Sequence, residues 1–173
     1  MNTQVRENVV LVGMPGAGKT TIGVLLAERL GFDFVDTDIL MQTGEGRKLQ
    51  QIIAARGLDG FRRIEEQTIL SLSVSSHVIS TGGSVIYSVK AMEHLKRRGW
   101  VCHLDIAPRR LKERLDNIET RGIVMAPGQT IESLHRERYP LYRQHADMTV
   151  DSGQLAPGEV IQRIESAWTA LAG

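Results

Sequence analysis

The sequence predicts an α/β fold of three layers, in which a parallel β-sheet carries helices on both faces. Two observations support this fold class. Short apolar runs typical of buried strands alternate along the chain with segments whose apolar residues recur at helical spacing. In addition, a glycine-rich loop joins the first apolar run to the first helical segment.

The glycine-rich loop matches the pattern G-x-x-x-x-G-K-[S/T] at every fixed position. Backbone N–H groups and the helix dipole at the start of the following helix attract phosphate, so we expect a fold of the P-loop NTPase type that binds ATP. Lys19 is expected to reach the β- and γ-phosphates, and the Thr20 hydroxyl to ligate Mg²⁺. The residues expected to contact ATP in this stretch are Gly13, Met14, Pro15, Gly16, Ala17, Gly18, Lys19, Thr20 and Thr21.

Length and composition indicate one globular domain covering residues 1–173. The formal net charge of +1 gives no reason to expect nucleic acid or an anionic membrane as a partner, and no apolar run approaches membrane-spanning length. Cys102 is the single cysteine and cannot form an intrachain disulfide, which favours a reducing cytoplasm. We expect a monomer that acts on a small molecule.

In chain order, the first strand is predicted over residues 8–12, and the helix that follows the loop ends at Gly31. A second strand covers 33–36. Residues 39–72 have a helical pattern that is broken near the glycines of 44–46 and 57–60. The third strand, 77–80, leads into the turn TGGS at 81–84.

The second half continues the alternation. Ser88 is a candidate N-cap for a helix to residue 98, and a fourth strand is predicted over 100–105. Pro108 opens a helix to about residue 116, and 117–129 has no strong period and is predicted to be a loop. Thr130 caps a helix to about residue 145, which Pro140 is expected to kink or break. A last strand, 146–151, and a terminal helix, 157–171, complete the chain.

Two carboxylates lie at the end of the second strand, in the segment Asp36-Thr37-Asp38. Ligands in open parallel sheets bind outside the carboxyl ends of the strands, and alternation sends both aspartates to the same side of an extended chain. A pair of carboxylates beside a phosphate site suggests that one lies near Mg²⁺ and the other near the attacking hydroxyl. The alternative is an ordinary aspartate N-cap.

The segments FRRIEE, residues 61–66, and HRERYPLY, residues 135–142, carry many charges. Taken alone, each is typical of a solvated helix face with ion pairs such as Arg62–Glu65.

Taken together, however, these segments resemble the shikimate kinases. The matching pieces are GMPGAGKTTIG, FVDTD, FRRIEE, TGG and RERYPLY…AD, in this order, and they extend from the phosphate loop to about Asp151. The resemblance implies a P-loop kinase sheet with a mobile lid, here about 117–129, and a helical region that binds shikimate. It also implies transfer of the γ-phosphoryl group of ATP to a ring hydroxyl of shikimate, with Mg²⁺ as cofactor.

Carried over to this chain, the resemblance implies that Asp36 holds the hydration shell of Mg²⁺, with Thr20 as the other metal-side residue. Asp38 would bind the substrate hydroxyls and accept a proton. Arg62 and Arg138 would clamp the substrate carboxylate, a task that suits a bidentate guanidinium.

Further substrate contacts are implied at the turn, where Gly82 and Gly83 let the backbone approach the substrate. Arg114 lies where the family stacks an arginine near adenine. The chain departs from the family at Ser84, where a third glycine is usual; its hydroxyl is expected beside the substrate, as a further substrate contact. It also departs in the lid, which usually has an arginine followed by Pro-Leu-Leu. Arg121 can still supply the lid charge and contact ATP, so Lys19, Asp38 and Arg121 are the expected catalytic residues.

Two other functions remain open from the sequence. The Ser84 and lid departures favour a kinase of another small hydroxylated acid or polyol, of which gluconate is an example, that uses the same ATP site. A nucleotide-binding module without catalysis is the third hypothesis. The aspartates and the lid arginine argue against it, because binding alone needs neither.

Overall fold

A computed structural model describes residues 6–116 and 123–172 of the chain. Its centre is a five-stranded sheet in the order β2-β3-β1-β4-β5, and every strand pair is parallel. The strands are β1 (Asn8–Val12), β2 (Asp33–Asp36), β3 (His77–Ser80), β4 (Gly99–Asp105) and β5 (Met148–Asp151). The predicted α/β class and parallel sheet are therefore confirmed.

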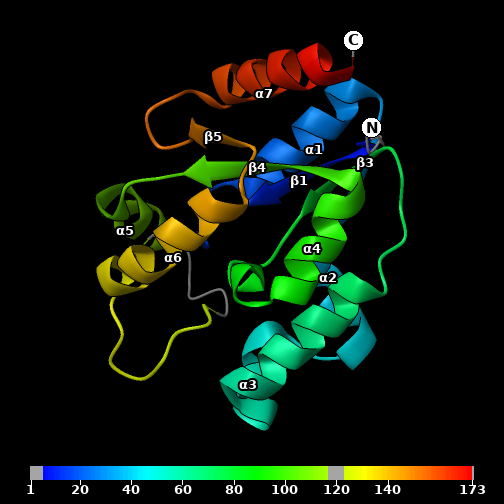
Figure 1. Cartoon of the computed structure of the whole chain (residues 1–173). Helices are drawn as coiled ribbons and strands as arrows, with labels where there is room; N and C mark the ends of the chain where they lie inside the picture. Colours follow the sequence, from blue (N-terminus) through cyan, green and yellow to red (C-terminus); the bar gives the residue numbers. More distant parts are fainter. Residues whose placement is uncertain (1–5, 117–122, 173) are drawn as a thin grey trace.

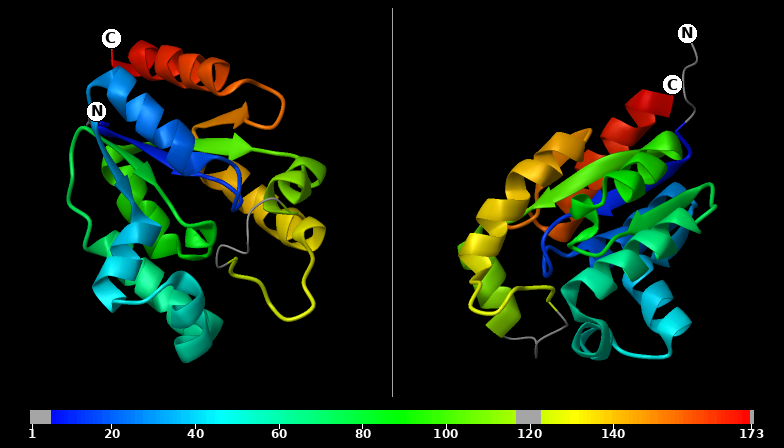
Figure 2. Two further views of the ribbon diagram at one scale, coloured as in Figure 1. Left: turned by 180° about the vertical axis from the view of Figure 1, so that it is seen from behind. Right: turned by 60° about the horizontal axis from the view of Figure 1, so that its bottom comes forward.

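Helices cover both faces of the sheet (Figure 1). Helices α1 and α7 lie side by side on one face, while α4 and α6 lie over the other, and the view from behind in Figure 2 agrees. Helices α2 and α3 pack on each other and extend beyond the sheet, and α3 also packs against α4. The bounds are α1 (Lys19–Leu30), α2 (Thr37–Glu45), α3 (Leu49–Leu70), the 3₁₀ turn η1 (Val85–Tyr87), α4 (Val89–Arg98), α5 (Pro108–Asp116), α6 (Ile131–His145) and α7 (Pro157–Ala172).

Most predicted boundaries agree with these bounds, and the caps explain why. Ser88 accepts a hydrogen bond from the Ala91 N–H at the start of α4, and Thr130 caps α6 through the Ser133 N–H. The expected break near 57–60 is real, because Gly57 has φ 67° and ψ 178° inside α3.

The structure differs from the sequence prediction at two points. Helix α6 runs through Pro140 without a break, so the break, one of the two predicted alternatives, is wrong, and the kink stays a prediction. Pro140 is exposed, so water can satisfy the carbonyl of Arg136 that loses its N–H partner. The turn η1 was not predicted, because three residues are too few to show a helical period.

The core is built around β1, whose residues 9–12 are fully buried. Apolar side chains from all the layers pack around this strand. A second, smaller cluster consists of Met41, Ile52, Phe61 and Val124 and belongs to α2, α3 and the segment before α6. No helix in the described residues is long and apolar enough to cross a bilayer.

Because all strands are parallel, their carboxyl ends lie at one edge of the sheet. The glycine-rich loop follows β1, Thr37 and Asp38 follow β2, and the turn 81–84 follows β3. The turn is fixed to β1, because both the N–H and the hydroxyl of Thr81 donate to the carbonyl of Leu11, at 3.2 and 2.9 Å. This edge brings together the segments that the sequence singled out.

The close packing of α1 on β2 leaves no room for a side chain at Gly23. A Cβ at this position would lie 2.6 Å from Cε2 of Phe34 and 3.4 Å from Cδ1 of Leu11. Gly23→Ala is therefore expected to lower the free energy of unfolding by about 1–3 kcal/mol, despite the better helix propensity of alanine. Urea denaturation measures the change.

Gly44 in α2 is the matched control, because no heavy atom lies within 4 Å of a Cβ built there. Gly44→Ala should be neutral or should stabilise by up to about 1 kcal/mol. Equal stability of the two variants would contradict the packing argument.

Candidate functional site

The glycine-rich loop leads into the start of α1 and surrounds the ammonium group of Lys19. Gly18, immediately before the helix, has φ 94°, a value that favours glycine. Lys19 is buried, and its Nζ donates to the carbonyls of Gly13 at 2.8 Å and Met14 at 3.0 Å. Burial lowers the pKa of Lys19 to about 8, and the nearby Asp38 opposes that shift. The arrangement presents a cation and a helix N-terminus to one point, which suits phosphate.

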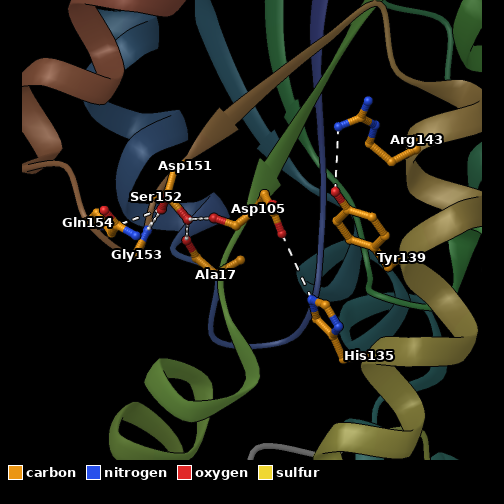
Figure 3. A network of polar contacts seen from close by, with 9 residues as sticks. All are labelled: Ala17, Asp105, His135, Tyr139, Arg143, Asp151, Ser152, Gly153 and Gln154. Carbon is orange, nitrogen blue, oxygen red and sulfur yellow. Dashed lines mark hydrogen bonds and ion pairs between the residues drawn. The ribbon is translucent and has the colours of Figure 1, made fainter.

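Side chains from α5 and from the residue after the edge strand β5 hold this loop in place, and Figure 3 shows Ser152 beside Ala17. Arg114 of α5 donates from Nη1 to the Gly16 carbonyl at 3.1 Å and from Nη2 to the Ser152 carbonyl at 2.8 Å. The buried Oγ of Ser152 lies 3.0 Å from the carbonyls of Ala17 and Asp105, to either of which it can donate. Arg114 therefore touches the phosphate loop, and its predicted place near adenine stays a prediction. Ser152 was not predicted, because a lone serine after a strand carries no motif.

Asp36 serves as a helix cap and lies beside Thr20 at the same time. Its Oδ1 accepts from the N–H groups of Asp38 at 2.9 Å and Ile39 at 3.4 Å, and its Oδ2 accepts from the Thr20 hydroxyl at 2.8 Å. The geometry is thus compatible with both interpretations of Asp36, as the N-cap of α2 and as a carboxylate near Mg²⁺. Two hard oxygen donors beside the phosphate loop fit Mg²⁺, which takes few protein ligands and completes its shell with phosphate and water. The described residues contain no cluster of three or more His, Cys, Asp or Glu side chains that could hold a metal by themselves.

Asp38 and Glu65 converge on the backbone of Gly82. A Cβ on Gly82 would lie 2.8 Å from Oδ1 of Asp38 and closer still to Oε1 of Glu65, so only glycine fits. The Gly82 N–H donates to the buried Thr37 hydroxyl at 3.3 Å, which fixes the turn against α2. Burial, and then the charge of Asp36, raise the pKa of Asp38 to about 6.

Ser84 points to Glu65 and not to open space. Its hydroxyl donates to Oε2 of Glu65 at 2.5 Å, and both side chains are buried. Oε1 of Glu65 is buried with no hydrogen-bond partner among the described residues. Burial raises the pKa of Glu65 to about 7, which the Ser84 hydrogen bond opposes. Glu65 was not among the predicted site residues, although it lies in FRRIEE, because its i,i+3 spacing from Arg62 equally suits a surface ion pair.

The two arginines of the predicted clamp come from different helices and meet at one tyrosine. Arg138 of α6 is buried and donates from Nη2 to the Val124 carbonyl at 2.7 Å and from Nε to the Tyr87 hydroxyl at 3.3 Å. The Cζ of Arg62, on α3, lies 4.4 Å from the centroid of the Tyr87 ring. Gly83 lies beside them, since a Cβ there would be 3.0 Å from Nη1 of Arg138. No sequence motif had indicated Tyr87.

A cavity of about 590 Å³ connects the phosphate loop to the turn 81–84. Its lining includes Lys19, Asp38, Glu65, Arg114 and Arg138. Arg62 is not among the described lining residues, and Arg121 lies outside the residues that the structure describes. The cavity can hold a phosphorylated molecule at the helix end and an anionic, hydroxyl-bearing molecule at the carboxylate and arginine end.

Comparisons with known proteins show which family this chain resembles. The family model for shikimate kinase matches residues 15–169. A shikimate kinase of Aromatoleum aromaticum is 41% identical over 92% of this chain and 93% of its own length, and one of Thiobacillus denitrificans is 40% identical over 86% and 83%. The solved structure of an Acinetobacter baumannii shikimate kinase in complex with shikimate superposes with a TM-score of 0.88, at 32% identity, over 96% of this chain and 95% of that one.

The burial of Glu65 predicts a pH dependence of stability. The folded pKa of about 7 exceeds the ordinary value of 4.5, so the folded state holds a proton that the unfolded state has lost between these pH values. The free energy of unfolding should therefore contain a contribution from Glu65 that is present below pH 4.5 and is lost as the pH rises through 7. That contribution is on the order of 3 kcal/mol.

Glu65→Gln keeps an acceptor for Ser84 but does not titrate, so its stability should fall less between pH 4.5 and 7 than that of the wild type. Urea denaturation at several pH values measures both curves. If the free energy of unfolding changes with pH in the same way in both proteins, burial does not raise the pKa of Glu65.

Proposed function

The chain belongs to the shikimate kinase family, and we propose that its site transfers the γ-phosphoryl group of ATP to a hydroxyl group of shikimate, with Mg²⁺ as cofactor. The observation that carries this proposal is the likeness to the Acinetobacter baumannii enzyme, which is solved in complex with shikimate and shares the fold over 96% of this chain. The cavity between the phosphate loop and the two arginines supports it.

At the ATP end, the loop 13–20 binds the phosphates through its backbone N–H groups and the N-terminus of α1. The Lys19 ammonium stabilises the charge on the transferred group. Thr20 and Asp36 would hold Mg²⁺, which neutralises charge on the β- and γ-phosphate oxygens when it is bound. Arg114 contacts the loop from α5, on the side where adenine is expected.

At the shikimate end, Asp38 orients the acceptor hydroxyl and takes its proton. A pKa raised to about 6 leaves this carboxylate ionised at neutral pH, yet makes it a stronger base than an ordinary aspartate. Gly82 and Gly83 leave room for the substrate beside the turn, and Arg62 and Arg138 bind its carboxylate.

The single kinase domain, residues 1–173, includes a lid at about 117–129, from which Arg121 adds positive charge at the transferred phosphoryl group. The described end of this segment is connected to the site in two ways. Val124 packs with Met41, Ile52 and Phe61, and its carbonyl accepts from Arg138. We also propose that the enzyme is a monomer in the cytoplasm; the single, buried Cys102 supports the reducing compartment.

Ser84 does not by itself require a different acceptor. Its hydroxyl donates to Glu65, so the departure from the family glycine is accommodated within the protein. Ser84 also lines the cavity, so it stays a candidate substrate contact, and kinases of other hydroxylated acids or polyols become outcomes of the acceptor assay below.

The proposed function predicts ADP release that depends on shikimate. Shikimate, gluconate and a polyol without a carboxylate are compared in a coupled ADP assay with Mg²⁺ and ATP, and shikimate should give the highest kcat/KM. Lys19→Met is the negative control, because loss of a donor to the developing charge lowers kcat by about 10²–10³-fold or more. Circular dichroism checks that this variant is folded. No turnover with any acceptor would favour a binding module, and a preference for gluconate would overturn shikimate as the substrate.

If Arg62 binds the substrate carboxylate, its loss should change the KM for shikimate and not the KM for ATP. Loss of a buried charge-assisted contact costs about 2–5 kcal/mol, so Arg62→Ala should raise the KM for shikimate by tenfold or more while the KM for ATP changes little. Arg63→Ala is the matched control, because Arg63 is exposed on the same helix. An unchanged shikimate KM in Arg62→Ala would show that Arg62 does not bind the acceptor.

A further inference from the structure

We infer that Tyr87 is the positioning residue of the carboxylate clamp: its side chain sets the spacing and orientation of Arg62 and Arg138, and thereby the preference for an acceptor that carries a carboxylate. The inference rests on the proposed function and deepens it. The observation behind it is that arginines from two different helices contact the same tyrosine.

The aromatic ring provides the first contact. The Cζ of Arg62 lies 4.4 Å from the ring centroid and that of Arg138 lies 5.4 Å from it. Both distances fall within the range in which the negative face of an aromatic ring attracts a guanidinium. Two like charges near one another repel, and a ring that attracts both offsets the repulsion without using the N–H groups that a carboxylate needs.

The need for such a contact is clearest at Arg62. Its Nε is buried and has no hydrogen-bond partner among the described residues. No ion pair with an acidic side chain is found for Arg62 in the described part of the chain. The Tyr87 ring is thus the contact that fixes where this guanidinium lies.

The phenol hydroxyl of Tyr87 provides the second contact, and its hydrogen bonds hold the ring in one orientation. The Tyr87 hydroxyl accepts from Nε of Arg138 at 3.3 Å and donates to Oε1 of Glu137. The other Glu137 oxygen accepts from Nε2 of Gln129 at 2.9 Å. Burial raises the pKa of Tyr87, so the phenol stays neutral and can donate and accept in this way at neutral pH.

The backbone of Tyr87 is attached to the turn that faces the substrate. Its N–H donates to the Ser84 carbonyl at 3.1 Å, and Tyr142 donates to the Gly83 carbonyl at 2.5 Å. The tyrosine therefore connects the turn, α3 and α6, so that the positions of both arginines are defined relative to the groups beside Gly82 and Gly83. A carboxylate bound by two guanidinium groups from separate helices requires this relative placement.

The experiment compares shikimate with its methyl ester, which keeps the hydroxyls and lacks the negative charge. Tyr87→Leu removes the ring and the hydroxyl. It should raise the KM for shikimate by about tenfold, leave the KM for ATP within about twofold, and reduce the preference for shikimate over the ester. Tyr87→Phe keeps the ring and should show a smaller change in the same direction.

Tyr139→Leu is the matched control. Tyr139 lies on α6 next to Arg138, and an arginine, Arg143, lies over its ring at 6.0 Å (Figure 3). Among the described residues, however, the ring and hydroxyl of Tyr139 contact neither Arg62 nor Arg138. The Tyr139→Leu enzyme should keep the wild-type KM for shikimate and the wild-type preference for shikimate over the ester.

Wild-type turnover of shikimate tests the proposed function, and the ratio of each variant to the wild type tests the role of Tyr87, so the two failures are distinguishable. Shikimate KM and ester discrimination that are unchanged in both Tyr87 variants would overturn the inference, as would an equal rise in the KM for ATP. If Tyr87→Leu does not fold, Tyr87→Phe decides: a weaker preference for shikimate over the ester supports the inference, and an unchanged preference overturns it.

Discussion

The parallel pairing of β1 with both β3 and β4 is the constraint on which the rest of the structure depends. Residues 9–12 of β1 are fully buried, so the strand can pair on both edges and pack on both faces only in the middle of the sheet. Its central place brings the phosphate loop between the turns that follow its neighbours. Ser152 and Arg114 then hold the loop from the side of β5.

Burial of charged groups is the second determinant of the site. Lys19, Asp38 and Glu65 lie within one poorly hydrated region, where burial lowers the pKa of the lysine and raises those of the two acids. Such shifts cost stability and are typical of functional sites, because they place proton affinities near neutral pH. The Ser84 hydroxyl moderates this effect at Glu65 alone, through one short hydrogen bond.

The acceptor side of the site has a small apolar core of its own, distinct from the main core around the sheet. Met41, Ile52 and Phe61 of α2 and α3 pack with Val124 of the segment before α6. This cluster joins parts of the chain that are about 60 residues apart or more. Arg138 of α6 contacts the same segment through the Val124 carbonyl and contacts η1 through Tyr87, which links the proposed shikimate site to the end of the proposed lid.

The sequence by itself determined the strands, the parallel sheet, the phosphate loop and the aspartates after β2, because these depend on local periodicity, glycine geometry and strand-end position. Only the tertiary structure decided that Ser84 donates to Glu65, that Ser152 supports the loop and that Tyr87 lies against both arginines. Each of those contacts joins residues at least 19 positions apart in the chain, and no local pattern encodes which side chains packing brings together.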